Sequence, residues 1–324
     1  MKRPLLLAAL SLLAACAPRS EAFDPARLPD PADLGAKPAN TEWWYVSAYL
    51  PDSQESFHWA QFKVNYRGLL VHAGHIAVAD LARNTLDFLE NRSQDAAFGF
   101  PPLSVRQGDW KLVQQGNTYL LRAGPLDLTL TPLKGPVVHP PGYSGTAEVG
   151  RLYYQSITRL DLTGTIGGKA VRGLAWLDHQ WGDQMPGRQA LWDWFGLHLS
   201  DGSDLMLYRV KKLDGTVVQL AGSRVGVDGV AREVRNVTMT PTRSWKSPTG
   251  RSYSLAWKIE AEGLSLDMNA VRDDQELISK TTNIAYWEGP QAGGGTVDGQ
   301  PVHAEGMGEF VGGALSQAEG GYGP

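Results

Sequence analysis

From residue 41 onward, the chain alternates apolar and polar residues over short runs, which is the pattern of half-buried β-strands. The runs TEWWYVSAYL at 41–50 and FHWAQFKVNY at 57–66 are rich in aromatic and β-branched types. Asp-Gly pairs at 201–202, 214–215 and 228–229 separate later runs and suit tight hairpin turns. No long stretch shows the 3.6-residue period of an amphipathic helix. The pattern therefore predicts an all-β fold, either a barrel or a sandwich.

A change of composition near residue 200 predicts two β-rich halves. Motifs dense in tryptophan precede this point, and the three hairpin turns follow it. We therefore expect one domain over 38–200 and a second domain over 201–315. The Gly-rich run at 291–300 is expected to be a loop, and residues 316–324 are expected to be a flexible tail.

Residues 1–16 have the layout of a bacterial lipoprotein signal peptide. A lysine and an arginine precede an apolar run that is too short to form a stable membrane span. The sequence Leu-Ala-Ala-Cys that follows resembles a lipobox, which would make Cys16 the acylated N-terminus of the mature chain. An ordinary signal peptide with an incidental cysteine is the alternative. The lipobox predicts an exported lipoprotein of the cell envelope, anchored to the membrane, with proline-rich residues 17–37 as its tether.

Composition and charge exclude several classes of protein. The 324 residues include 30 Lys and Arg against 34 Asp and Glu, a net charge of −4, which argues against a nucleic-acid binder. The single cysteine, Cys16, excludes an intrachain disulfide, a CxxC redox motif and a four-cysteine zinc site. His72 and His75 would point to opposite faces of a strand and so make a poor chelating pair, and we expect no metal site. We also expect no cofactor. The motifs GxSxG, HExxH, GxGxxG and the P-loop are absent.

Candidate chemistry lies where aromatic residues flank ionisable ones, first at residues 42–45. Strand alternation places Glu42 and Trp44 on one face, and Trp43 and Tyr45 on the other. A carboxyl group held against indole rings would have a raised pKa, which suits proton transfer. The alternative is a core tryptophan pair with Glu42 at the surface or in a salt bridge.

The strongest cluster is WLDHQW at residues 176–181. Alternation puts Asp178 on the face of Trp176, and His179 with Trp181 on the opposite face. Histidine is the usual acid or base near neutral pH, and an aspartate can fix its tautomer. Because Asp178 points away from His179, a carboxylate partner of His179 would come from elsewhere in the fold. The alternative is a buried histidine that is hydrogen-bonded to the backbone.

Two further aromatic clusters could line a ligand pocket. Trp192 and Trp194 share one strand face, either as core or as the lining of a barrel for an apolar ligand. Near the C-terminus, Tyr286 and Trp287 stand beside Glu288, with packing of a strand end by its aromatic residues as the alternative.

Several of these motifs occur in one order: TEWWYV, AGHIAVAD with His75, LDHQWG, WDWFGLHLSDGSDLMLY and YWEG. Together they resemble the AttH/carotenoid 1,2-hydratase family, whose bacterial members are often labelled secreted hydrolases. The resemblance covers roughly residues 38–312 and implies two tandem lipocalin-like β-barrel domains. It also implies an enzyme that adds water to a carbon–carbon double bond, with functional roles for His179 and Trp181. The last strand departs from the family pattern, but Glu309 keeps the position of its glutamate.

Two functions fit these observations. The first is an enzyme that acts on a small apolar molecule by acid-assisted hydration or hydrolysis, with His179, Asp178 or Glu42 as proton donor. The second is a non-catalytic lipocalin-type carrier or envelope scaffold. The residues expected to contact the ligand are Trp43, Trp44, Trp181, Trp192, Trp194, Tyr286, Trp287 and His75. Convergence of the three donor candidates in one pocket would favour the enzyme, and their separation would favour the carrier.

Overall fold

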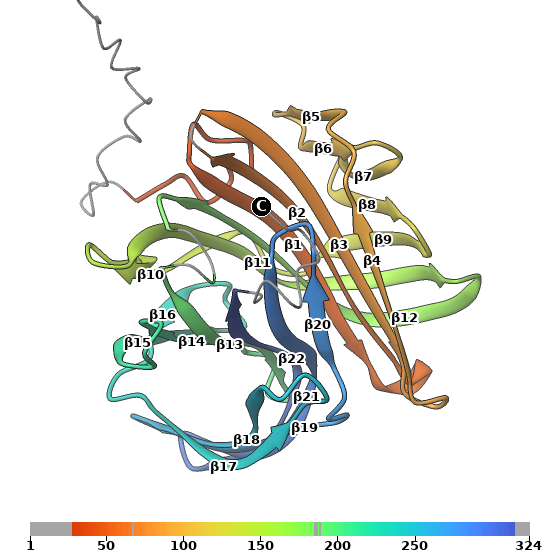
Figure 1. Cartoon of the computed structure of the whole chain (residues 1–324). Helices are drawn as coiled ribbons and strands as arrows, with labels where there is room; N and C mark the ends of the chain where they lie inside the picture. Colours follow the sequence, from red (N-terminus) through yellow and green to blue (C-terminus); the bar gives the residue numbers. More distant parts are fainter. Residues whose placement is uncertain (1–27, 67, 185–186, 188, 315–324) are drawn as a thin grey trace, which may run out of the picture.

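The computed structural model describes residues 28–66, 68–184, 187 and 189–314, and nearly all of its regular structure is strand (Figure 1). Among these residues, helical structure is confined to a 3-10 turn, η1, at Pro51–Ser53. No helix in this part of the chain is long and apolar enough to cross a membrane. The signal peptide and the tail that the sequence predicts lie outside the described residues. The all-β prediction is confirmed.

Twelve strands form the first sheet, in the order β4-β3-β2-β1-β12-β11-β9-β8-β7-β6-β5, with β10 paired to β11. Antiparallel neighbours need only short turns, so strands adjacent in sequence are mostly adjacent in the sheet. The strands are β1 (Thr41–Leu50), β2 (Glu55–Tyr66), β3 (Leu69–Asp80), β4 (Thr85–Asn91), β5 (Ala96–Gly99), β6 (Ser104–Gln107), β7 (Trp110–Gln115), β8 (Thr118–Ala123), β9 (Leu126–Pro132), β10 (Val137–Thr146), β11 (Gly150–Ile166) and β12 (Lys169–Gly182).

Ten strands form the second sheet, in the order β16-β15-β14-β13-β22-β21-β19-β18-β17, with β20 paired to β21. They are β13 (Leu191–Leu199), β14 (Asp204–Lys211), β15 (Val217–Val225), β16 (Ala231–Glu233), β17 (Thr238–Lys246), β18 (Ser252–Ala261), β19 (Leu264–Ala270), β20 (Glu276–Ser279), β21 (Ile284–Val297) and β22 (Gln300–Ala314). The two curled sheets are the two lipocalin-like domains that the sequence predicted (Figure 1).

The chain passes from the first sheet to the second between Gly182 and Leu191, earlier than the predicted boundary at residue 200. Strand β13 therefore belongs to the second sheet, where it pairs with β14 and β22. The predicted boundary followed tryptophan density, which does not stop at the domain border. Trp194 of β13 packs across that border against Tyr45 of β1, with ring centroids 5.7 Å apart.

The three Asp-Gly pairs lie in the hairpins between β13 and β14, β14 and β15, and β15 and β16, as predicted. Their glycines, Gly202, Gly215 and Gly229, have φ angles of 82°, 88° and 73°. In each turn, the aspartate carboxylate accepts the backbone N–H two residues further on. The glycine thus supplies the left-handed conformation, and the aspartate closes the turn.

The Gly-rich run at 291–300 is strand except for a two-residue turn at 298–299, so its prediction as a loop was wrong for most of its length. Strand β21 continues to Val297, and β22 begins at Gln300. A Cβ atom on Gly293 or Gly295 would lie 2.0 Å or 1.9 Å from a carbonyl oxygen of β19. Glycine is required here because the neighbouring backbone approaches closely.

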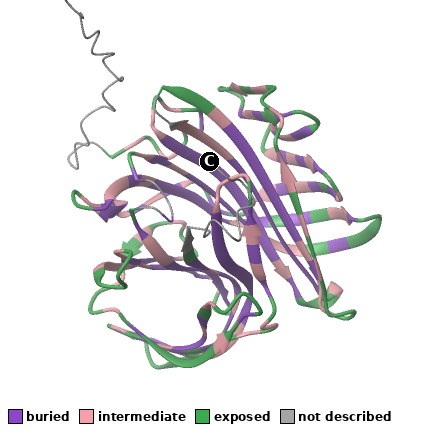
Figure 2. Cartoon of the chain, viewed as in Figure 1, coloured by how far each residue is buried: buried purple, intermediate pink, exposed green. Residues whose placement is uncertain are grey.

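Buried residues run along the strands of both curled sheets, where the ribbon is purple in Figure 2. The first core contains Trp59 and Leu128, and the second contains Trp257 and Leu266. A third buried cluster draws on both domains and includes Trp43, Tyr45, Tyr154, Trp176, Trp194, Tyr208 and Met307. The domains therefore share an apolar interface.

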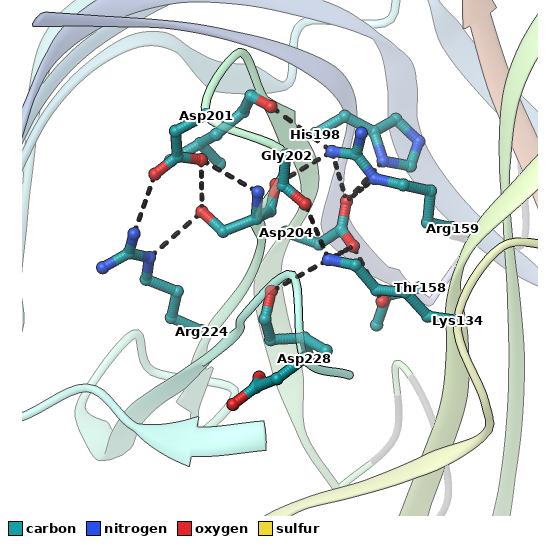
Figure 3. Close-up of polar contacts among 12 residues, drawn as sticks. Lys134, Thr158, Arg159, His198, Asp201, Gly202, Asp204, Arg224 and Asp228 are labelled. Atoms are coloured by element: carbon teal, nitrogen blue, oxygen red, sulfur yellow. Dashed lines mark hydrogen bonds and ion pairs between the residues drawn. The ribbon is translucent and has the colours of Figure 1, made fainter. Parts of the chain in front are cut away.

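A buried ion cluster around Asp204 also joins the two domains (Figure 3). Asp204 of β14 accepts hydrogen bonds from Lys134 Nζ at 2.7 Å and Arg159 Nε at 2.9 Å, both from the first domain. His198 Nδ1 lies 2.8 Å from the same carboxylate, and Thr158 Oγ1 donates to it at 3.0 Å. Burial alone would raise the pKa of Asp204, but His198 and the two cations hold it below its ordinary value. Separating the domains here would leave charges unpaired, which is costly.

Candidate functional site

A cavity of about 60 Å³ lies in the seam between the two domains. Its walls come from β1, β2, β3, β10, β11 and β12 of the first domain and from β13, β14, β21 and β22 of the second. The space is large enough for several water molecules. The walls combine aromatic rings with three carboxyl groups, Asp178, Glu288 and Glu309. Within the described part of the chain, no three His, Cys, Asp or Glu side chains are arranged to hold a metal ion.

Strand register explains why these side chains share the cavity. Residues paired across neighbouring antiparallel strands point to the same face of a sheet. One such row crosses β11, β12, β1, β2, β3 and β4 and consists of Ser156, Asp178, Tyr45, Ala60, His75 and Glu90. A second row crosses β13, β22 and β21 and consists of Trp194, Glu309 and Glu288. The apolar interface brings the two rows face to face.

Asp178 is buried and accepts three hydrogen bonds. Tyr154 OH donates at 2.9 Å, Trp176 Nε1 donates at 2.5 Å, and the Ser156 hydroxyl is the third donor. Trp194 Nε1 donates to Tyr154 OH at 2.7 Å, which directs the tyrosine proton toward Asp178. Burial raises the pKa of Asp178 to about 7, although the three donors oppose the rise. The group therefore changes its protonation near neutral pH, as acid–base residues of active sites do.

Glu309 and Glu288 are neighbours across β22 and β21. Burial raises the pKa of Glu309 to about 7. The hydrogen bond from Trp192 Nε1, at 2.9 Å, acts to lower this pKa, and the charge of Asp178 acts to raise it further. Burial and the charge of Glu309 also raise the pKa of Glu288 well above its ordinary value, although Tyr45 OH donates to it. Two adjacent buried carboxylates repel each other, so the pair retains a proton at neutral pH. Glu309 keeps an intermediate exposed surface because it faces the cavity.

Two buried histidines also line the cavity. His58 Nδ1 lies 3.0 Å from Glu288 Oε2, and His75 Nδ1 lies 2.9 Å from Tyr286 OH. Burial lowers the pKa of His58 well below its ordinary value and that of His75 to about 4. Both rings are therefore neutral at neutral pH, and each offers one hydrogen-bond donor and one acceptor.

Aromatic rings form the apolar part of the cavity wall. Trp43 stacks on Trp192 across the seam, with centroids 6.2 Å apart and planes at 13°. Tyr45 meets Trp194 edge-on at 5.7 Å. Ring faces bind apolar molecules, and they also attract positive charge. The cavity therefore suits an apolar molecule on which positive charge develops beside a proton donor.

Six of the residues predicted from the sequence line this cavity: Asp178, Trp43, Trp192, Trp194, Tyr286 and His75. Five others are not among its lining residues: Glu42, His179, Trp44, Trp181 and Trp287. Trp287 is fully buried in the core of the second domain. Asp178 and the pair formed by His179 and Glu42 therefore do not converge, because strand alternation puts them on opposite faces of the first sheet. The separation of these three donor candidates favours a carrier by the criterion given above, but Asp178 does share the cavity with two other carboxyl groups, Glu288 and Glu309.

His179 and Glu42 form a buried pair inside the first domain. His179 Nε2 lies 2.9 Å from Glu42 Oε1, so the carboxylate partner does come from elsewhere in the fold. The imidazole ring stacks on Trp44 at 4.8 Å and on Trp181 at 4.6 Å between centroids. Burial lowers the pKa of His179, while Glu42 acts to raise it. Lys63 Nζ also donates to Glu42, so every charge in this cluster has a partner.

The same cluster holds the segment that precedes β1. Lys37 N donates to Glu42 Oε1 at 2.8 Å, and Trp44 Nε1 donates to the Leu34 carbonyl oxygen at 2.8 Å. Leu34 is 2% exposed, so the end of the predicted tether is docked on the first domain rather than extended in solvent. An apolar side chain within the proline-rich segment explains this difference. Cys16 and the start of the tether lie outside the described residues.

Neither Tyr154 nor His58 was predicted from the sequence to be a functional residue. Glu309 was noted only as a position shared with the family, and Glu288 only as the neighbour of an aromatic pair, with a packed strand end as the alternative. One signal was available, because Tyr286 and Glu288 are two residues apart and so share a strand face. The pairing of Glu288 with Glu309 depends on strand register, which no local pattern reveals.

Comparisons with known proteins agree with this architecture. The AttH-like family model matches residues 22–313. The chain is similar to the structure of an AttH protein from Nitrosomonas europaea, with 26% identity, a TM-score of 0.77, and coverage of 90% of this chain and 99% of that one. No curated protein matches it.

Two more distant structures share the fold. Kievitone hydratase from Nectria haematococca is 17% identical, with a TM-score of 0.67 and coverage of 88% of this chain and 93% of that one. CghA with Sch210972 is 15% identical, with a TM-score of 0.56 and coverage of 86% and 89%. Since the family model spans nearly the whole described chain, the protein belongs to the AttH-like family.

Proposed function

We propose that the protein is an enzyme that adds water to a carbon–carbon double bond of a small apolar molecule bound between its two domains. The single observation behind this proposal is the Glu309 carboxyl group. It faces a cavity walled by tryptophans, and its pKa is raised to about 7. Within the described residues it receives one hydrogen bond, from Trp192. A carboxylic acid with such a pKa is partly protonated near neutral pH and can therefore act as a general acid.

The chemistry follows from the residues around that acid. Glu309 transfers its proton to one alkene carbon, and the π electrons form the new C–H bond while the other carbon becomes electron-deficient. The faces of Trp43, Trp192 and Trp194 stabilise this positive charge. Water attacks the electron-deficient carbon and loses a proton, so the substrate gains one H and one OH in total. General acid catalysis of this kind contributes about 10²–10⁴-fold in rate.

The name of one structural neighbour supports this choice of reaction. Kievitone hydratase is named as a hydratase and shares the fold at 17% identity. Hydrolysis, the other reaction expected from the sequence, would also use a proton donor, but it would break a bond to a heteroatom, such as the C–O bond of an ester, and would leave any carbon–carbon double bond in place. The carrier interpretation requires the ligand to leave unchanged. The three functions therefore predict different products.

One experiment separates these outcomes. The full chain, in detergent micelles, is incubated in H₂¹⁸O with a panel of phenolic and isoprenoid alkenes, and the products are weighed by mass spectrometry. We expect a product heavier than its substrate by one labelled water. Glu309→Gln should lower kcat by about 10²–10⁴-fold. Glu305→Gln is the matched control, because Glu305 lies on the same strand but does not line the cavity. Wild-type activity in Glu309→Gln would contradict the assignment, and ligands recovered unchanged would establish a carrier.

We also propose that the protein works outside the cytoplasm, anchored by acylation of Cys16. The support is the N-terminal pattern of two cations, a short apolar run and the Leu-Ala-Ala-Cys sequence. The variant Cys16→Ser cannot be acylated at this position, so it should be released from the membrane fraction. A variant that is still processed and remains membrane-bound would contradict the lipid anchor.

A further inference from the structure

A chain of hydrogen bonds leads from the cavity to the protein surface along the seam between the domains. Tyr286 OH, in the cavity wall, lies 2.9 Å from His75 Nδ1. On the other side of the imidazole ring, His75 Nε2 lies 2.8 Å from Ser279 Oγ and 2.9 Å from Thr281 Oγ1. Both hydroxyls reach the Glu90 carboxylate, at 2.9 Å and 2.6 Å. Every link in this chain, the last one included, joins a residue of one domain to a residue of the other.

The protonation state of Glu90 sets the direction of this chain. Burial alone would raise the pKa of Glu90, but the bonds from Thr281 and Ser279 lower it, and Glu90 is ionised at neutral pH. An ionised carboxylate only accepts hydrogen bonds, so the Ser279 and Thr281 hydroxyls both donate their hydrogens to Glu90. Their oxygen atoms are then acceptors toward His75, and His75 Nε2 must be the donor.

The tautomer of His75 in turn orients Tyr286. A neutral imidazole that carries its hydrogen on Nε2 has a lone pair on Nδ1. Tyr286 OH therefore donates to His75 Nδ1, and the phenol oxygen presents its lone pairs to the cavity. His58 Nε2 is the other ring nitrogen near this oxygen, at 3.5 Å. Tyr286 is thus set up as an acceptor of a proton from the cavity, in contrast to Glu309, which donates one.

We propose that Tyr286 is the base that takes the proton from the attacking water, and that His75, Ser279, Thr281 and Glu90 conduct it to solvent. This inference rests on the proposed hydration. As the water oxygen bonds to carbon, one O–H bond breaks and its proton goes to the Tyr286 oxygen. The phenol hydrogen passes to His75 Nδ1, and the Nε2 hydrogen passes to a hydroxyl oxygen. That hydroxyl releases its own hydrogen to Glu90, which passes it to solvent. The Tyr286 oxygen, the His75 ring and the hydroxyl therefore each gain one proton and lose one, while the ring hydrogen moves from Nε2 to Nδ1.

Exposure shows where the proton leaves the protein. The His75 side chain is 0% exposed, whereas that of Glu90 is 14% exposed and lies 3.5 Å from Arg92, which is 54% exposed. The relay therefore connects a sealed position beside the cavity with a carboxylate at the surface. Tyr286 is the catalytic residue in this scheme, because it contacts the reacting water. His75 and Glu90 act through it and are positioning residues.

The first test needs no substrate. Nitrogen NMR of the full chain labelled at histidine reports which nitrogen of His75 carries the hydrogen, with His75→Gln identifying the resonance. We expect the hydrogen on Nε2, and we expect the double variant Ser279→Ala/Thr281→Val to lose this preference. A hydrogen on Nδ1 in the native chain would overturn the relay and leave the proposed hydration standing.

The second test separates positioning from binding. Tyr286→Phe should lower kcat for the labelled product by about 10²–10⁴-fold. Glu90→Gln should lower kcat by a smaller factor and leave KM unchanged, because Glu90 does not contact the substrate. Glu276→Gln is the matched control, because Glu276 of the second domain accepts hydrogen bonds from the hydroxyls of Thr249 and Tyr253 and does not line the cavity. If Tyr286→Phe keeps the wild-type kcat while Glu309→Gln is inactive, the relay is overturned and the proposed hydration stands. No turnover in the native chain would overturn the hydration and the relay together.

Discussion

The ion cluster at Asp204 gives a prediction whose magnitude follows from the structure. The Asp204 side chain is 0% exposed, and its partners Lys134 and Arg159 are 5% and 14% exposed. In Asp204→Asn, the two cations lose their anion while they remain buried. Breaking a buried ion pair from one side costs about 3–5 kcal/mol of unfolding free energy. An equally simple change at a surface pair, Asp267→Asn opposite Lys258, should cost about 0–1 kcal/mol, because Asp267 is 68% exposed.

Urea denaturation followed by tryptophan fluorescence measures this difference. With a slope of about 3 kcal/mol per molar urea for a chain of this size, a loss of about 3–5 kcal/mol moves the midpoint by about 1–1.7 M. The unfolding transition should also broaden, because the cluster is one of the contacts that make the two domains unfold cooperatively.

The pH dependence of this effect has a definite sign. The pKa of Asp204 is lowered in the folded state, so its contribution is present above the ordinary value of 3.8. The contribution is lost as the pH falls through the folded-state pKa. The difference between the native chain and Asp204→Asn should therefore shrink in acid. A midpoint within about 0.3 M of the native value at neutral pH, roughly 1 kcal/mol at that slope, would refute the reasoning.

Three further predictions concern the cavity wall, a glycine strand and the His179 cluster. The pKa of Asp178 is raised to about 7 from 3.8, so the folded state binds one more proton than the unfolded state between these pH values, and the unfolding free energy falls as the pH rises through them. Asp178→Asn should flatten this fall, measured by urea denaturation at a series of pH values. An unchanged dependence of the unfolding free energy on pH would contradict the raised pKa. Gly295→Ala should lower the unfolding free energy by about 1–3 kcal/mol, because its Cβ would meet a carbonyl oxygen at 1.9 Å; a thermal melt with an unchanged midpoint would argue against the close strand approach. Glu42→Gln should speed proteolysis in the segment before β1 and leave kcat unchanged, because Glu42 holds that segment from the face opposite the cavity; a large loss of kcat with native protease resistance would place this pair in the reaction instead.

Much of the fold follows from local patterns in the sequence. Alternation correctly placed Trp43 and Tyr45 on the face opposite to Glu42 and Trp44, because a strand has a period of two whatever its neighbours are. The Asp-Gly pairs marked hairpins because their backbone preference is local. The same reasoning failed for the Gly-rich part of β21, where glycine is dictated by strands distant in sequence.

The site depends on contacts that local patterns do not determine. Six of the predicted residues line the cavity because aromatic clusters in the sequence mark buried faces of strands. Which buried face belongs to a barrel core and which to the seam is decided by how the two sheets pack. His179 lies on one and Asp178 on the other, although they are adjacent in sequence. The pairing of Glu288 with Glu309, and the relay from Tyr286 to Glu90, join residues brought together by register and domain packing.

Double isotope labelling tests the central claim most directly. The native chain converts an alkene substrate in a mixture of D₂O and H₂¹⁸O, and NMR with mass spectrometry locates both labels in the product. Acid-assisted hydration predicts one deuterium on the carbon next to the one that carries the new ¹⁸O hydroxyl, both in a single intact molecule. Labelled oxygen in one of two cleavage fragments, or substrate recovered without either label, would contradict the account.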